Sequence, residues 1–140
     1  MMVSIRIALQ ISGLILSLSA QVQADIVAVV SAQSSITRLS TSQLSDIFLG
    51  KVSRFPDGTP AVPVDLGNGS AERDQFYAKV AGKTPAQIKA YWSKVIFTGR
   101  GQPPKTVQNN GDMKKYVAAN VDAIGYIDSK MVDDSVRVLR

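Results

Sequence analysis

Apolar positions along the chain form short runs whose pattern predicts strands. Residues 25–30 form a continuous apolar run rich in β-branched residues, which is typical of a strand buried on both faces of a parallel sheet. Residues 61–66 and 123–127 have the same character, and a last strand is predicted near 136–139. Pro63 removes one ladder donor, so it predicts that its strand lies at an edge or that the proline stands near the strand start.

Helices are predicted where a capping residue precedes apolar positions at helical spacing. Ser40 and Thr84 are each followed three residues later by a glutamine, which is the pattern of a capping box. Pro85 stands at the first helical position, where a missing N–H costs nothing. The predicted helices begin after Ser40, Ser70, Thr84 and the Asn109-Asn110-Gly111 turn, and they end near Gly50, Gly82, the loop at 98–105 and Ala119.

Strands that alternate with capped helices predict an α/β fold, a single three-layer domain with a mixed, mostly parallel sheet and flanking helices. Parallel order and right-handed crossovers are the default expectations. Residues 36–39 are expected to be a short extended piece, and residues 98–105 an irregular basic loop. The helix after Thr84 carries its apolar stripe through Trp92, which is expected in the core.

The first 24 residues have the pattern of a secretory signal peptide. Arg6 supplies a positive charge, residues 7–18 are mostly apolar but short for a membrane span, and Val22-Gln23-Ala24 resembles a signal peptidase site. We therefore expect a periplasmic protein, secreted through a cleaved signal peptide, whose domain covers residues 25–140. No later segment is apolar enough to suggest a membrane crossing.

The amino-acid composition limits the metal-binding and catalytic chemistry that this chain could carry out. The chain contains no cysteine and no histidine, which removes the usual zinc, copper and thiol chemistries and the commonest general base. The clustered carboxylates are Asp65, Glu72 and Asp74, and acids that open a helix are ordinary. We expect no enzyme activity, no cofactor and no metal site. Without the predicted signal peptide, which contains Arg6, the chain has 15 basic and 11 acidic residues and a formal charge of +4.

That mild positive charge suits an anionic ligand. The basic residues are scattered, without a basic run or interleaved aromatic residues, so nucleic acid is not an expected partner. Charge of this size also serves solubility alone in many proteins.

The strongest candidate for ligand binding is the glycine-rich turn after residues 61–66. Gly67-Asn68-Gly69 reverses the chain and Ser70 occupies a helix N-cap position. Backbone N–H groups at such a helix start are unpaired and the helix dipole adds positive charge, so the turn is suited to an anion. The predicted anion-binding residues are Gly69, Ser70, Ala71 and Arg73, with Arg100 and Lys105 as weaker candidates. Most turns of this kind only reverse the chain.

Three segments together resemble the phosphate-binding proteins of bacterial phosphate ABC transporters, within the type 2 periplasmic binding protein fold. They are the run Leu39-Ser-Thr-Ser-Gln-Leu-Ser-Asp-Ile-Phe-Leu-Gly-Lys51, the turn with Gly69-Ser70 and Phe76, and Asp122-Ala-Ile-Gly-Tyr-Ile127. The chain is more similar still to short exported proteins that carry only that part of the family. The resemblance implies a single lobe, mainly the second of the two lobes that enclose the anion in the family.

The chain departs from the family pattern at the anion turn. The resemblance implies Arg-x-x-Gly-Ser-Gly-Thr, but Leu66 stands in place of the arginine, and Ala71 and Glu72 in place of the last two residues. The threonine hydroxyl is therefore missing and a carboxylate enters the first helical turn. Arg73 could supply a guanidinium from a different position.

These observations leave two functions open. The first is a protein that binds phosphate or a related oxyanion, works with an ABC transporter and forms a homodimer in which two lobes enclose the ion. The second is an interaction module that has lost the ligand and docks on an ABC permease or membrane sensor. An exposed face containing Tyr77, Tyr91 or Tyr126 would serve that second function.

Overall fold

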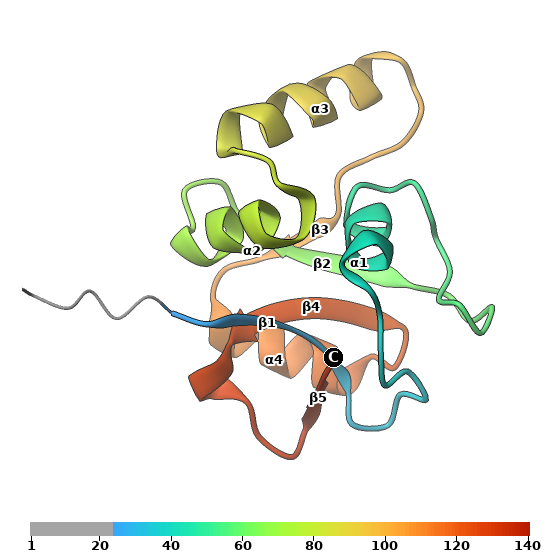
Figure 1. Cartoon of the computed structure of the whole chain (residues 1–140), viewed down its shortest axis with the longest axis vertical. Helices are drawn as coiled ribbons and strands as arrows, with labels where there is room; N and C mark the ends of the chain where they lie inside the picture. Colours follow the sequence, from blue (N-terminus) through green and yellow to red (C-terminus); the bar gives the residue numbers. More distant parts are fainter. Residues whose placement is uncertain (1–23) are drawn as a thin grey trace, which may run out of the picture.

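A five-stranded sheet with helices on both faces forms the part of the chain that the computed structural model describes, residues 24–140 (Figure 1). The predicted signal peptide falls on residues 1–24 and so lies, except for Ala24, outside the described residues. The elements in chain order are β1 (Ile26–Ser31), α1 (Thr41–Phe48), β2 (Val62–Leu66), α2 (Ala71–Ala81), α3 (Pro85–Phe97), β3 (Lys105–Val107), α4 (Asn110–Ala119), β4 (Ala123–Asp128), the 3₁₀ turn η1 (Ser129–Met131) and β5 (Val136–Val138).

The sheet has the strand order β3-β2-β4-β1-β5. β2 pairs in parallel with β3 and β4, whereas β1 pairs antiparallel with β4 and β5. Four strands therefore run in one direction and β1 runs against them, which confirms a mixed, mostly parallel sheet. The expectation that β1 pairs in parallel was wrong, because burial on both faces depends on the covering layers and not on strand direction.

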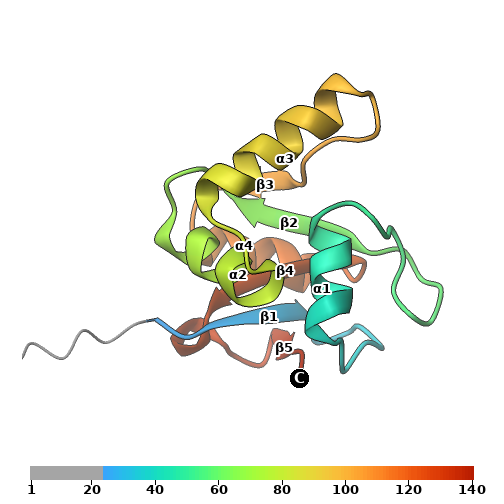
Figure 2. The same cartoon turned by 45° about the horizontal axis from the view of Figure 1, so that its top comes forward.

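Helices on both faces make the predicted three layers. α1 and α2 pack on one face of the sheet, and α4 packs on the other against β4 and β1. α4 lies so close to β4 that a Cβ on Gly125 would be 2.5 Å from Sδ of Met113 and 2.9 Å from Val117. α3 contacts α2 and projects from the sheet (Figure 2).

Helix boundaries follow the predicted caps. Ser40 Oγ accepts a hydrogen bond from the Gln43 N–H at 3.1 Å, and the Gln43 side chain accepts one from the Ser40 N–H at 2.8 Å. Thr84 and Gln87 form the same pair at the start of α3. Reciprocal bonds of this kind satisfy donors that a helix start leaves unpaired, so local sequence sets where α1 and α3 begin.

An aromatic cluster forms the centre of the core. The rings of Phe76 and Tyr126 stack at 4.0 Å, and Phe48 meets Phe76 edge to face at 4.7 Å. Tyr77 is also buried. The interpretation of Tyr77 and Tyr126 as parts of an exposed face was therefore wrong, because α2 and the central strand β4 turn these rings inward.

Some local predictions differ from the structure. Residues 36–39 belong to no strand, although Ile36 and Leu39 are buried. β3 was not predicted, because three largely exposed residues give no periodic signal. Trp92 lies in the core as predicted and Val95 is partly buried against it, but Ile96, which the predicted stripe also included, is exposed. In the described range, helices are too short or too polar to cross a membrane.

Candidate functional site: the amino end of α2

The turn between β2 and α2 leaves backbone donors directed at solvent. Gly69 has a φ of +88°, a conformation that favours glycine, and the turn is exposed. Ser70 caps α2, its Oγ accepting a hydrogen bond from the Arg73 N–H at 3.2 Å. Within residues 24–140, the N–H groups of Gly69, Ala71 and Glu72 have no hydrogen-bond partner. These donors and the dipole of α2 make a place where an anion would be stabilised.

Arg73 lies beside this turn but is held from within the protein. Its Nε is 3.5 Å from Asp65 Oδ2, and its guanidinium lies 5.2 Å from the centre of the Tyr77 ring. The residue is only 9% exposed. The two terminal nitrogens have no partner among the described residues and are not among the solvent-inaccessible polar atoms. A guanidinium fixed on one side in this way can still donate to a ligand from the other side.

Asp65 is the centre of the network that holds Arg73. It is buried and accepts hydrogen bonds from Tyr77 Oη at 2.6 Å, from Tyr126 Oη and from the Leu66 N–H at 2.9 Å. Burial raises the pKa of both tyrosine hydroxyls, and the negative charge of Asp65 raises it further. Both hydroxyls therefore stay protonated and donate, so the carboxylate has donors on every side and its geometry is fixed.

Glu72 places a negative charge at the same helix end. Its Oε2 accepts a hydrogen bond from Ser70 Oγ at 3.0 Å, and its Oε1 lies 3.5 Å from Asn110 Nδ2. The carboxylate interacts favourably with the amino end of α2. It also engages the hydroxyl proton of Ser70, so an incoming anion would have to displace Glu72 to receive that hydrogen bond.

A small hollow of about 220 Å³ opens beside the end of β2. Arg73 lines it together with Asn68, Thr106 and Lys89. Lys89 adds a second cation to this hollow from α3. Lys89 could not be selected from the sequence, because it stands on the exposed side of a helix whose position over β2 depends on tertiary packing.

The weaker candidates lie elsewhere. Arg100 lines a different hollow, between the end of α1 and α3. The ammonium group of Lys105 lies 4.5 Å from the centre of the Tyr116 ring, a cation–π contact on the α4 side of the sheet edge. The structure therefore brings Gly69, Ser70, Ala71 and Arg73 together, and it places Arg100 and Lys105 apart from them. Across residues 24–140, no three acidic side chains gather in a way that could hold a metal ion.

Comparison with solved structures finds the same fold in phosphate-binding proteins. A structure assigned as a phosphate ABC transporter substrate-binding protein with bound phosphate, from Clostridium perfringens, is 26% identical with a TM-score of 0.68, over 84% of this chain and 44% of that chain. An ABC-type phosphate transport receptor from Vibrio cholerae is 21% identical with a TM-score of 0.65, over 84% and 46%.

The chain has the fold of phosphate ABC transporter substrate-binding proteins. PstS from Borrelia burgdorferi, at 15% identity and a TM-score of 0.60 over 83% of this chain and 46% of that chain, shares the fold as well. This chain spans less than half the length of these three proteins, which agrees with the single lobe that the sequence predicted. No family model and no curated protein matches the chain. The named functions of these neighbours are binding and transport.

Proposed function

We propose that this chain is a periplasmic protein that binds phosphate or a related oxyanion at the amino end of α2. The observation that carries the proposal is the set of three unpartnered N–H groups, on Gly69, Ala71 and Glu72, next to the fixed guanidinium of Arg73. The fold is shared with a protein whose structure contains phosphate. Ser70 would add its hydroxyl once Glu72 moves away.

The site is open to solvent, so the bound ion would keep part of its hydration shell and exchange quickly. A second copy of the chain, or another protein, would be needed to enclose it. A transporter permease is the partner that the shared fold suggests, and the predicted signal peptide would place this chain on the periplasmic side of the membrane that holds such a permease. We assign no catalytic residue, no cofactor and no metal to this function.

The test is thermal unfolding of residues 25–140 with phosphate, sulfate, arsenate and chloride at matched ionic strength. A ligand that binds only the folded state adds roughly 2.7 kcal/mol of stability at a hundredfold excess over Kd. We expect a rise with phosphate that is absent with chloride. The variant Arg73→Lys keeps a positive charge opposite Asp65 but loses the terminal guanidinium nitrogens. The effect of phosphate on the stability of this variant is measured against the stability of the same variant without phosphate. Absence of any oxyanion effect at millimolar concentrations would rule the proposal out.

A second function is favoured by the position of Glu72. Its carboxylate accepts the hydrogen bond that an anion would take from Ser70, and Asp65 already balances the charge of Arg73. A lobe whose site is filled by its own carboxylate could serve as a ligand-free module that docks on a membrane sensor or transporter. That function predicts no oxyanion effect on unfolding, and a partner that can be crosslinked to this chain in the periplasm.

A further inference from the structure

A second hollow, larger than the one at α2, lies where the end of α1 faces α3. Its volume is about 590 Å³, within the range of roughly 300–1,000 Å³ that is usual for small-molecule sites. It is lined from the α1 end by Leu49 to Lys51, from α3, and from the loop that follows α3. Trp92 is buried and lines both this hollow and the one beside Arg73, which otherwise have different lining residues.

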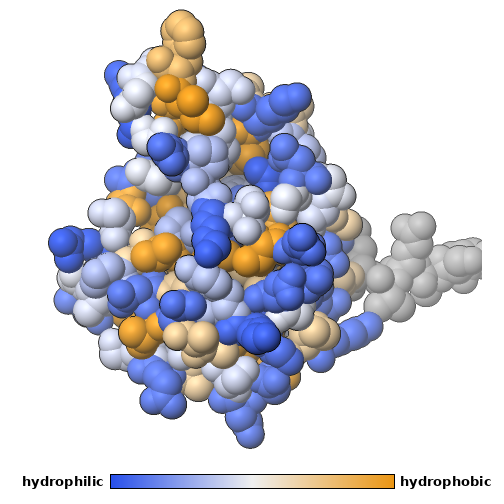
Figure 3. Space-filling view, turned by 180° about the vertical axis from the view of Figure 1, so that it is seen from behind, coloured by the Kyte–Doolittle hydropathy of each residue, from blue (hydrophilic) through white to orange (hydrophobic). Residues whose placement is uncertain are grey.

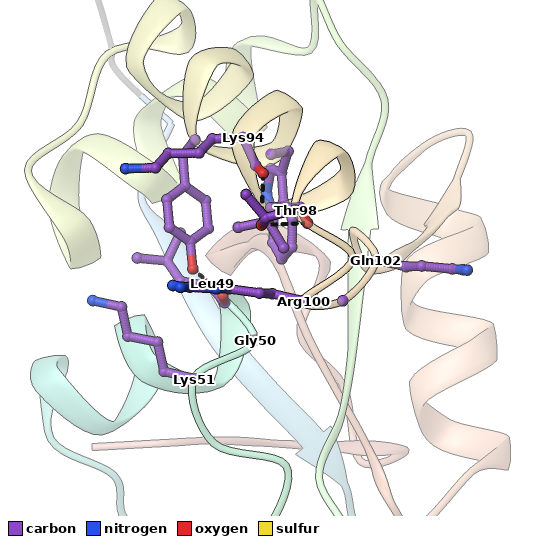
Figure 4. Close-up of a pocket in the computed structure, with 11 residues that line it drawn as sticks. Leu49, Gly50, Lys51, Lys94, Thr98, Arg100 and Gln102 are labelled. Atoms are coloured by element: carbon purple, nitrogen blue, oxygen red, sulfur yellow. Dashed lines mark hydrogen bonds between the residues drawn. The ribbon is translucent and has the colours of Figure 1, made fainter.

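Three cations line this hollow. Lys51 follows α1, Lys94 belongs to α3 and Arg100 belongs to the loop after it. Figure 4 shows the three charged ends on the same side of the hollow, whereas the Gln102 side chain points away from them. Among residues 24–140, no acidic group forms an ion pair with any of the three, and no acidic residue lines the hollow.

Each cation alone has an ordinary explanation. Lys51 and Lys94 stand near the carboxyl ends of helices, where a positive charge is favourable. A favourable position at a helix end does not explain why three cationic side chains from three segments line one concave surface. Exposed like charges that share one surface repel one another weakly in water, and an anion bound among them would relieve that repulsion.

The hollow also has a fixed apolar wall. Tyr91 donates a hydrogen bond from its hydroxyl to the Leu49 carbonyl at 2.6 Å, and its ring meets the Trp92 ring edge to face at 5.1 Å. Val95 lies on the same wall. The tyrosine ring is therefore held in place without a ligand, and an apolar part of a ligand could lie against it at little entropic cost.

The geometry points to a binding site for a diphosphate ester, distinct from the oxyanion site at α2 and independent of it. A phosphate monoester carries about two negative charges near neutral pH, so three cations match a group with more charge than that. The apolar wall of Tyr91, Trp92 and Val95 would receive the organic part. All three cations are exposed, so the charges are partly hydrated and the affinity would depend on salt.

Isothermal titration calorimetry with ADP, pyrophosphate and orthophosphate, without divalent cations and at matched ionic strength, tests this inference. We expect ADP to bind most tightly, then pyrophosphate, then orthophosphate. The double variant Lys94→Gln/Arg100→Gln should weaken ADP binding by about a hundredfold, since each charge-assisted hydrogen bond is worth about tenfold or more. Lys130→Gln, an exposed lysine outside both hollows, should leave it unchanged.

The variant Arg73→Lys separates this site from the α2 site. If ADP binding survives Arg73→Lys and is lost in the double variant, the inference stands whatever happens to phosphate. If ADP binding is lost in Arg73→Lys but kept in the double variant, the ligand binds at α2 and the inference is wrong. Equal affinity for ADP and pyrophosphate, equal weakening by Lys130→Gln, or no binding of either diphosphate would overturn it as well.

Discussion

The amino end of α2 and the carboxyl end of α3 both present positive charge, but they hold it in opposite ways. At α2 the guanidinium of Arg73 is buried and tied to a carboxylate that has two tyrosine donors. At α3 the side chains of Lys94 and Arg100 are exposed and lack an ion-pair partner in the described part of the chain.

This difference in burial and pairing separates a charge that stabilises the fold from charges that remain available for a ligand. A buried ion pair with several hydrogen bonds fixes geometry, and removing one partner leaves the other charge uncompensated. Exposed cations contribute little to folding and remain available for a ligand. The α3 region also exposes apolar side chains: Ile96 and Phe97 are exposed on α3, and an apolar group protrudes from the α3 end of the molecule (Figure 3).

The largest expected effect concerns Asp65. Asp65→Ala removes the acceptor of Arg73, Tyr77 and Tyr126 together, so we expect a loss of about 3–5 kcal/mol in the free energy of unfolding. Asp65→Asn keeps the shape and part of the hydrogen bonding, and should cost less. Urea unfolding measures both, with exposed Asp134→Ala as the control. An Asp65→Ala protein as stable as the control would contradict the description of α2.

Alkaline pH should weaken the same region. Burial and Asp65 raise the pKa of Tyr77 and Tyr126 in the folded protein. Their contribution to stability is therefore fully present below about pH 10, the unfolded pKa, and is lost as pH rises above it. Each tyrosine contributes a slope of up to about 1.4 kcal/mol per pH unit in that range. Unfolding free energies measured from neutral pH upward should fall less steeply in Tyr77→Phe than in the native chain, and an unchanged slope would refute this explanation.

Removing the carboxylate at the α2 site should strengthen anion binding. Glu72→Gln keeps an acceptor for Ser70 but no longer repels a bound anion, so phosphate affinity should rise by about tenfold. Asp112→Asn makes the same charge change in the first turn of α4 and should change little. Calorimetric titration with phosphate compares the two variants, and equal affinities would mean that Glu72 does not compete with the ion.

The smallest expected effect belongs to the α3 cations. Lys94→Gln and Arg100→Gln should each change the free energy of unfolding by no more than about 0.5 kcal/mol, as is usual for exposed side chains outside a network. Thermal unfolding at low and high salt measures this. A loss as large as that of Asp65→Ala would mean that the two regions do not differ as described.

Capping and turn signals in the local sequence predicted much of the fold. The capping boxes at Ser40 and Thr84 and the glycine at position 82 placed helix ends correctly, because cap bonds join residues only a few positions apart. The pairing of β1 could not be foreseen, since strand direction depends on partners far along the chain. The short β3 offered too few residues for a pattern to emerge.

The candidate site was foreseen only in its local part. The turn and Ser70 follow from the order of glycines and cap residues, and they lie where the sequence placed them. The link between Asp65 and Tyr126 joins residues 61 positions apart, and Lys89 reaches the hollow only because α3 lies across the end of β2. Neither leaves a periodic signal, so both required the tertiary structure.

The most direct measurement of the central claim is a two-dimensional amide NMR titration of the chain with phosphate. Binding at the amino end of α2 predicts that the amide resonances of Gly69, Ala71 and Glu72 move saturably. The amides at the start of α4, including Gly111, serve as the internal control and should stay in place. Saturable movement confined to the α2 amides would support an oxyanion site there. Resonances that remain still, or that move equally at both helix starts, would contradict it.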